Sequence, residues 1–144
     1  MYMETHVDYT EPLIRNRGKT ALVYNDAGVS YEEVLRNIDG FSRQFDLEEG
    51  ERSCLFAENR PEWIYAFYAV WKQGGINSAV DSGAGREELL AVLEDCRPKI
   101  VFVSRKSSEI IDTVRDTLSW DPRILVLEEM GERLESERPD SAAE

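Results

Sequence analysis

Short apolar runs alternate with amphipathic stretches along most of this chain. The runs with strand character cover residues 20–24, 54–57, 76–80, 99–103 and 124–127. The last two are continuously apolar, which is typical of strands that are covered on both faces. Between the runs, apolar residues recur at helical spacing. The pattern therefore predicts strands and helices in alternation.

The first predicted helix follows a small hairpin. Residues 20–24 are β-prone, residues 25–28 (NDAG) supply a turn, and the extended chain resumes at Val29. Ser30 and Glu33 then have the spacing of a capping box at a helix start. The apolar positions that follow form one helical stripe: Val34, Leu35, Ile38, Phe41 and Phe45.

A second predicted helix contains the most apolar stretch of the chain. Asn59 and Glu62 again have capping-box spacing, and Pro61 falls in the first turn. From Trp63 to Trp71 nearly every residue is apolar, which predicts a helix buried on all sides. The strand–helix–strand unit around it predicts these core residues: Leu55, Phe56, Trp63, Phe67, Val70, Trp71, Ile100, Phe102, Ile124 and Val126.

Two further helices complete the predicted α/β fold. Leu89, Leu90, Val92 and Leu93 share one face before Pro98, and Ile110, Ile111, Val114 and Leu118 share another before Pro122. Alternation of this kind demands right-handed parallel crossovers. The predicted fold class is therefore α/β, a largely parallel sheet covered by helices on both faces, with a small N-terminal hairpin.

Composition divides the chain into three segments. Residues 1–19 form a polar arm with one short helical turn, for which Pro12, Leu13 and Ile14 are the predicted anchor. Residues 20–127 form the α/β domain. Residues 128–144 carry seven acidic residues against two arginines, and we expect this tail to be poorly ordered beyond about Arg133.

Charge and length limit the function classes. The chain has 144 residues, enough for one domain, and its 17 basic and 29 acidic residues give a net charge of −12. This charge argues against nucleic acid or an anionic membrane as the main partner. No apolar segment approaches the roughly 18 residues of a membrane span, and the start has no signal-peptide pattern, so we expect a cytoplasmic protein.

Few residues suggest chemistry by themselves. Cys54 and Cys96 are expected to be buried free thiols, and the single histidine, His6, argues against a histidine triad or a multi-histidine metal site. Gly83-Ala84-Gly85 resembles the start of a dinucleotide loop, but Glu88 stands where the third glycine is required, so a connecting loop is the favoured interpretation. No P-loop motif occurs.

Acidic pairs and aromatic residues have plain structural interpretations. Glu48-Glu49 and Glu87-Glu88 are interpreted as solvated charges, because sequence neighbours point in different directions. An aromatic cage or stacking platform is the alternative to core packing for the aromatic group, and helical spacing favours the core. That group comprises Trp63, Tyr65, Phe67, Tyr68 and Trp71.

Three stretches of the chain resemble a known protein family. They are TALVYNDAGVSYEEVLRNIDGFSRQF, GERSCLFAENRPEWIYAFYAVWKQGGINSAVD and REELLAVLEDCRPKIVFVS, together spanning roughly residues 18–104. Their order and spacing are similar to the N-terminal part of the adenylate-forming (AMP-binding) superfamily, most closely to acyl-CoA synthetases and fatty-acid–CoA ligases. One departure lies at residues 76–81, where the family usually has an apolar run followed by proline and then asparagine.

The resemblance implies an activity for a larger parent protein. Members of the family use ATP and magnesium to convert a carboxylic acid to an acyl-adenylate and pass it to a thiol such as coenzyme A. Their phosphate loop, Tyr-Gly-x-Thr-Glu segment, ribose-binding aspartate and C-terminal lysine do not occur in these residues. We therefore predict a truncated first subdomain that is inactive alone, and assign no catalytic, cofactor-binding or metal-binding residue to it.

Partners follow from the same resemblance. The rest of the parent chain is the expected partner, and an uncovered apolar stripe, either residues 34–45 or residues 110–118, would favour a homodimer. Two other hypotheses stay open on sequence alone. One is a free-standing flavodoxin-like or receiver-like α/β binding module, and the other is an interaction domain without a ligand.

Overall fold

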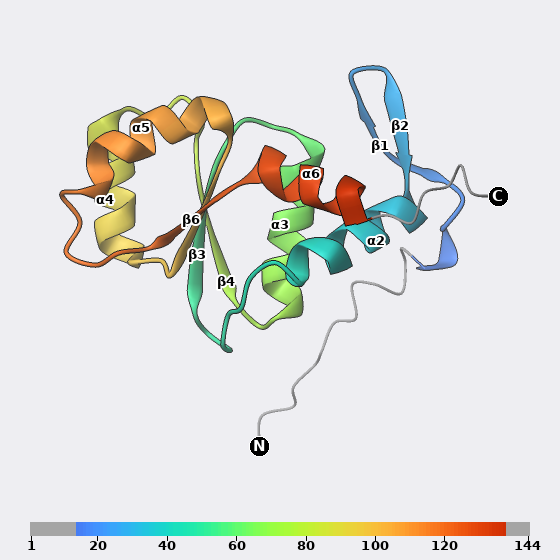
Figure 1. The fold of residues 1–144 in the computed structure, drawn as a ribbon, viewed down its shortest axis with the longest axis horizontal. Helices are drawn as coiled ribbons and strands as arrows, with labels where there is room; N and C mark the ends of the chain where they lie inside the picture. The colour runs from blue at the N-terminus through green and yellow to red at the C-terminus, as the bar shows by residue number, and fades with distance from the viewer. Residues whose placement is uncertain (1–13, 138–144) are drawn as a thin grey trace.

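The computed structural model describes residues 14–137, and its elements alternate as the hydrophobic pattern predicts (Figure 1). A helical turn at Ile14 and Arg15 precedes them; Pro12 and Leu13, also part of the predicted anchor, lie outside the described residues. The strands are β1 (Thr20–Tyr24), β2 (Ala27–Ser30), β3 (Arg52–Phe56), β4 (Ile76–Val80), β5 (Ile100–Val103) and β6 (Arg123–Val126). The helices are α2 (Tyr31–Ser42), α3 (Pro61–Lys72), α4 (Arg86–Cys96), α5 (Arg105–Arg115) and α6 (Leu127–Glu137).

The N-terminal hairpin is separate from the main sheet, from which it projects in Figure 1. Strands β1 and β2 are antiparallel, and Tyr24 pairs with Ala27. The two residues between them, Asn25 and Asp26, have φ values of 50° and 63°. Two successive positive φ values match the twist of a tight hairpin turn, and Asn and Asp tolerate them better than most residues.

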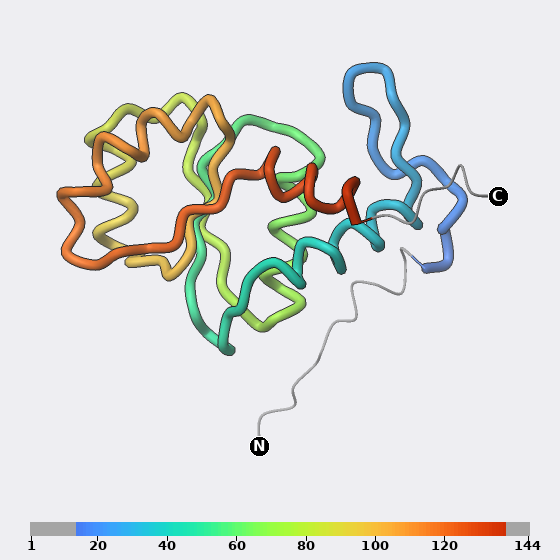
Figure 2. Tube along the Cα trace, viewed as in Figure 1, coloured from blue at the N-terminus to red at the C-terminus, as the bar shows by residue number. Residues whose placement is uncertain are grey.

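The main sheet has four parallel strands in the order β4-β3-β5-β6. Strand β3 pairs with both β4 and β5, so the chain moves outward to β4 and then crosses back over β3 to reach β5. Figure 2 traces this path. The order reverses between β3 and β5, which makes their carboxyl ends the topological switch point of the sheet.

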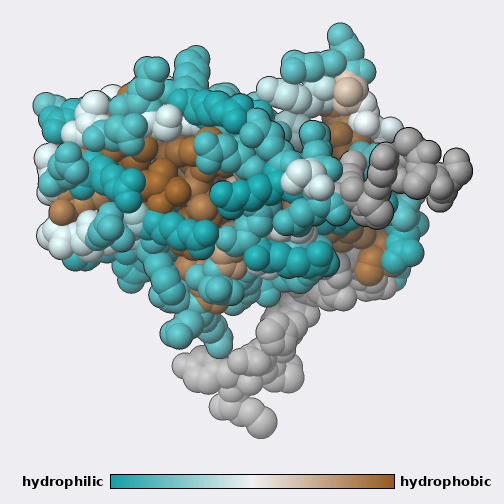
Figure 3. All heavy atoms as spheres, viewed as in Figure 1, coloured by the Kyte–Doolittle hydropathy of each residue, from teal (hydrophilic) through white to brown (hydrophobic). Residues whose placement is uncertain are grey.

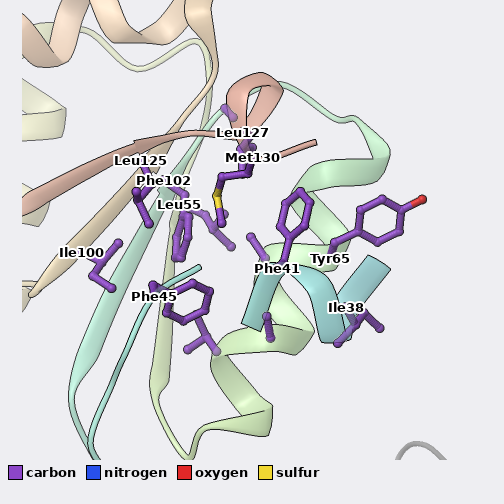
Figure 4. Close-up of a cluster of buried hydrophobic side chains, with 14 of the residues drawn as sticks. Ile38, Phe41, Phe45, Leu55, Tyr65, Ile100, Phe102, Leu125, Leu127 and Met130 are labelled. Carbon is purple, nitrogen blue, oxygen red and sulfur yellow. The ribbon is translucent and has the colours of Figure 1, made fainter. Parts of the chain in front are cut away.

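Helices cover both faces of the sheet, as predicted. On one face α2, α3 and α6 enclose a core that includes Phe41, Phe45, Leu55, Phe102 and Met130 (Figure 4). On the other face α4 and α5 pack over a second cluster. Its members come from β3, β4, β5, the two helices and the loop before α4: Cys54, Phe56, Val80, Ala84, Leu89, Leu93, Val101, Val103, Ile111 and Val114.

Helix α3 departs from its prediction in two ways. Its N-cap is Arg60, without a side-chain cap bond, and Asn59 is exposed, so the Asn59 capping box is wrong. The helix is also not buried on all sides, because Trp71 is 50% exposed and Trp63 and Phe67 are only partly buried. A helix that lies on one face of a sheet turns its outer side away from the core whatever residues it carries.

The acidic tail is the second correction. Residues 127–137 form α6, which packs on α2 and α3, whereas the sequence predicted poor order beyond about Arg133. Leu127 and Met130 are buried and Leu134 is partly buried, so three apolar residues at helical spacing anchor an otherwise charged helix. The remaining part of the predicted tail, 138–144, lies outside the described residues.

Strand β6 is the third correction. The sequence predicts Ile124 and Val126 as core, but both are only partly buried, whereas Leu125 between them is buried on the opposite face of β6. The stripes proposed for self-association are in turn mostly covered by the molecule itself. Val34, Ile38 and Phe41 of α2 are buried in one cluster, and Ile111 and Val114 of α5 are buried in the other.

Candidate functional site

The carboxyl edge of the sheet is the place where parallel α/β folds bind ligands, at the switch point between strands. Here Glu58 follows β3, Ser104 follows β5 and Glu128 follows β6. Arg60 and Arg105 lie at the starts of the neighbouring helices α3 and α5. These five residues form one polar network, defined here as the edge network.

Ser104 is the centre of the edge network and caps α5. It is fully buried, and its hydroxyl accepts a hydrogen bond from the Ser107 N–H at 3.1 Å. In return, the Ser104 N–H donates to the Ser107 hydroxyl at 2.9 Å. The Ser107 hydroxyl also donates to the Phe56 carbonyl of β3. This reciprocal capping box fixes the start of α5 against the end of β3.

The carboxylate of Glu58 lies against this helix start. It accepts a hydrogen bond of 2.6 Å from the Ser104 hydroxyl, and Arg60 Nη1 lies 3.4 Å from its Oε1. Burial opposes ionisation of this carboxyl, but the Ser104 hydroxyl and the Arg60 charge outweigh it and lower the pKa of Glu58. Glu58 is therefore ionised at neutral pH.

Arg60 joins three carboxylates. Its side chain is 15% exposed, and its guanidinium lies 2.8 Å from Glu62 Oε2 and 3.3 Å from Glu128 Oε2 in addition to Glu58. Burial alone would favour the neutral form, but these acidic neighbours outweigh it and raise the pKa of Arg60. The Arg60 guanidinium is paired with these three carboxylates, so its charge is not available to bind an anionic ligand.

The N-terminus of α5 is occupied in the same manner. The Arg105 N–H donates to both carboxylate oxygens of Glu128, at 3.2 and 3.0 Å, and the Arg105 side chain donates to Glu132 Oε1 at 2.7 Å. A helix N-terminus with free N–H groups is suited to bind phosphate. Here the carboxylates of Glu58, which follows β3, and of Glu128 in α6 lie in that position, so side chains of the chain itself take the place of a bound anion.

Two hollows flank the edge network. One, of about 490 Å³, lies among α2, α3 and α6 with Phe41 and Tyr65 in its lining, and its charged lining is Glu33, Arg60, Glu62, Arg105, Glu128, Glu132 and Glu135. The other, of about 520 Å³, lies between the ends of β3 and β4 and includes Glu58 and Asp81. Both therefore carry an excess of acidic groups, which opposes the binding of a phosphate chain.

The glycine-rich loop after β4 serves as a connection. The Gly83 N–H donates to Asp81 Oδ1 at 2.9 Å, and Gly85 is the N-cap of α4 without a side-chain cap. Glu88 is exposed. Asp81 thus accepts a hydrogen bond from within the loop, in agreement with the connecting-loop interpretation.

The remaining sequence interpretations have mixed outcomes. Glu48, Glu49, Glu87 and Glu88 are all exposed, as expected for solvated charges. Cys54 is a buried free thiol whose pKa burial raises to about 12, and Cys96 is a free thiol that is only partly buried. Among the aromatic residues of α3 only Tyr65 is buried, and Trp63 and Phe67 stack at 5.5 Å in a half-buried layer.

Sequence reasoning missed the edge network. Ser104 and Ser107 stood in a polar segment without a distinctive motif, and Glu58 and Glu128 are 70 positions apart. Only the Ser-x-x-Ser spacing at a strand end signalled a helix cap. Among residues 14–137 no three or more His, Cys, Asp or Glu side chains are grouped so that they could hold a metal ion. The assignment of no site residue stays a prediction.

Comparison with known proteins identifies the family. A family model described as AMP-binding enzyme matches residues 11–143. The chain belongs to this family of adenylate-forming enzymes. The resemblance of the N-terminal segments is thereby confirmed, and the match favours this hypothesis over a receiver-like module or a ligand-free interaction domain.

Relatives in the AMP-binding family are distant and much longer. Acetyl-coenzyme A synthetase of Leptospira biflexa is 26% identical over 111 residues, which are 71% of this chain and 16% of the relative. Tyrocidine synthase 1 of Brevibacillus parabrevis is 26% identical over 115 residues, 77% of this chain and 10% of the relative. The chain therefore spans about a sixth or less of these two proteins.

Solved structures confirm the fold. The anthranilate CoA ligase AuaEII, in complex with anthranoyl-AMP, superposes with a TM-score of 0.75 at 21% identity, over 84% of this chain and 26% of the ligase. The predicted α/β architecture is therefore that of N-terminal domains of adenylate-forming enzymes. Within the part of the chain that the structure describes, no helix is long and apolar enough to cross a membrane.

Proposed function

We propose that this chain is the first α/β subdomain of an ATP-dependent, AMP-forming ligase of the acyl-CoA synthetase type. In this proposal the parent enzyme activates a carboxylic acid as an acyl-adenylate and transfers the acyl group to coenzyme A, in the cytoplasm and with fatty acids as the substrate class. The observation that carries the proposal is the family match over residues 11–143. The acetyl-coenzyme A synthetases among the relatives support the choice of coenzyme A as acceptor.

In this proposal the chain contributes scaffold and no chemistry. Adenylation needs donors and cations directed at the phosphates. Arg60 and Arg105 lie at the carboxyl edge, and each is paired with carboxylates of the chain itself. The proposal therefore places ATP, magnesium and coenzyme A on other parts of the parent.

The inactivity of the chain alone is tested with two measurements. ATP–pyrophosphate exchange should stay at background, and millimolar Mg-ATP should leave the melting temperature unchanged, because stabilisation requires a ligand that prefers the folded state. Mg-ADP and sodium sulfate serve as matched controls for general anion effects. A rise of several degrees with Mg-ATP alone would contradict the proposal and reveal a nucleotide site.

The activity of the parent is tested by reading the gene beyond Glu144. The extended protein is assayed for acid-dependent pyrophosphate exchange with acetate, hexanoate, palmitate, benzoate and an amino acid, and then for thioester formation with coenzyme A. We expect exchange and a thioester with one of the fatty acids. A stop codon directly after Glu144, or adenylate formation without transfer to coenzyme A, would overturn the proposal as stated.

A further inference from the structure

A groove separates the outer edge of β1 from helix α3. One hollow of about 180 Å³ has Leu22, Val23 and Tyr24 on one wall and residues 59–61 and Ile64 on the other. A second hollow, of about 300 Å³, continues it, since Leu22 and Ile64 line both. Successive side chains of a strand point to opposite faces, so three consecutive residues on one wall indicate the edge of β1. We call these two hollows together the β1–α3 groove.

The edge of β1 in this groove has backbone groups directed away from β2. Among the described strands β1 pairs with β2 alone, with Tyr24 opposite Ala27 and Val23 opposite Gly28. Tyr24 and Ala27 flank the two-residue turn and form its hydrogen-bonded pair, and such pairs alternate with pairs that are not hydrogen bonded. Val23 therefore directs its N–H and C=O into the β1–α3 groove.

The opposite wall of the groove is apolar. It includes Trp63 and Phe67, whose stacked rings have centroids 5.5 Å apart, and Tyr31 and Val34 of α2 also line the groove. Figure 3 shows apolar surface at the base of the hairpin. A strand edge beside an apolar helix suits an extended segment, which gains main-chain hydrogen bonds from the strand and side-chain contacts from the helix.

We propose that residues 3–9 of the N-terminal arm occupy this groove as a third strand, antiparallel to β1. These residues, which lie outside the described part of the chain, read METHVDY. Met3, Thr5, Val7 and Tyr9 alternate with Glu4, His6 and Asp8. An alternation of this kind is typical of a half-buried strand, and Thr, Val and Tyr favour strands. The odd-numbered side chains face the aromatic wall, and the even-numbered ones face solvent.

The position of the described chain start supports this occupant. The Arg17 and Lys19 carbonyls each accept a backbone hydrogen bond of 3.0 Å from the start of α2, and the donor to Lys19 is Tyr31, which lines the groove. The arm therefore joins the fold beside the groove. Its connection to β1, residues 10–19, is shorter than the dozen or more residues of a parallel crossover, which is why the pairing is antiparallel.

A third strand would complete an otherwise minimal sheet. A two-stranded hairpin is marginally stable, whereas three strands with an apolar face hold together. In this arrangement the arm is a strap that ties the hairpin to α3 and covers the partly buried Trp63 and Phe67. The inference depends only on this chain and does not rest on the ligase proposal.

Two charge substitutions test which face of the arm is buried. In the full chain, amide exchange of residues 3–9 and of Val23, followed by NMR, should be at least about tenfold slower than in an unstructured peptide. Val7→Asp puts a charge against the apolar wall and should abolish this protection. His6→Asp is the matched control, because it adds the same charge one position along, on the solvent face, and should keep the protection.

A proline substitution tests the pairing with β1. Val23→Pro removes an N–H that points away from β2, so the hairpin ladder is kept while pairing with the arm is blocked. Val23→Thr is the matched control, because it keeps the N–H and a β-branched side chain. Only the proline variant should lose the protection of residues 3–9, and unchanged protection of β3 and β5 shows that it remains folded.

The other outcomes overturn the proposal. Residues 3–9 that exchange like an unstructured peptide in the unmodified chain show that the arm leaves the groove to another occupant. Equal protection in Val7→Asp and His6→Asp, or protection that survives Val23→Pro, shows that the arm does not pair as a strand at this edge. Protection that rises with protein concentration assigns the groove to a second copy. None of these measurements depends on enzymatic activity.

Discussion

Substituting Gly40 with alanine tests whether α6 packs on α2. A Cβ at position 40 would lie 2.3 Å from Leu134 Cδ2, 3.2 Å from Cδ1 and 3.3 Å from Cγ. A Cβ contact of 2.3 Å does not occur, so the Leu134 side chain must leave its position. Overpacking of this kind costs about 1 to 3 kcal/mol, and the better helix propensity of alanine offsets about 1 kcal/mol. We expect a net loss on the order of 1 kcal/mol in the free energy of unfolding.

A double-mutant cycle separates the two contributions. With Leu134→Ala in place the clash disappears, and Gly40→Ala should then stabilise the chain by about 0.5 to 1 kcal/mol. Gly131→Ala is the matched control, because its Cβ would meet Glu62 at an ordinary 3.6 Å. Urea unfolding followed by tryptophan fluorescence gives each free energy. Equal stabilisation by Gly40→Ala in both backgrounds would refute the packing of α6 at Leu134.

Three further predictions follow from burial, capping and charge. Phe102→Ala removes a fully buried side chain and should lower the free energy of unfolding by about 3 to 5 kcal/mol. Phe67→Ala should lower it clearly less, because Phe67 is only partly buried. Equal urea midpoints for the two variants would contradict this order. Ser104→Ala should lower the free energy of unfolding by at least about 1 kcal/mol through the loss of the α5 cap, whereas Asn59→Ala should leave it almost unchanged. A lower melting temperature for Asn59→Ala than for Ser104→Ala would argue for a cap at Asn59. Because the folded pKa of Glu58 lies below its ordinary value of 4.5, its contribution to stability is present above that value and is lost as the pH falls through the folded pKa. Chemical unfolding between pH 7 and pH 3 should therefore show a smaller acid-induced loss of stability for Glu58→Gln than for the unmodified chain, and equal losses would show that the carboxylate is not stabilised by its neighbours.

Local sequence patterns were sufficient to predict the elements that depend on neighbouring residues or on a continuous apolar run. The hairpin turn at Asn25 and Asp26, the cap at Ser30 and the buried run of β5 all lie where their side chains predict. Each depends on interactions within a few residues or on an unbroken apolar run. The alternation of strands and helices then limits the sheet to parallel crossovers.

The edge network could not be predicted because its members are far apart in the sequence. Glu58, Ser104 and Glu128 each look like ordinary polar residues after a strand. Their meeting depends on the strand order, which places the ends of β3, β5 and β6 side by side. This strand order cannot be read from a single sequence.

By itself the sequence determined the elements before α6, the parallel class of sheet and the resemblance to adenylate-forming enzymes. Only the tertiary structure decided which apolar residues are buried. Trp71 and Ile124 are as apolar as Val70 and Phe102, yet they lie on an outer helix face and an edge strand. Leu134, in an acidic segment, is partly buried against Gly40. Burial depends on what the fold places opposite a side chain, and that neighbour comes from a distant part of the chain.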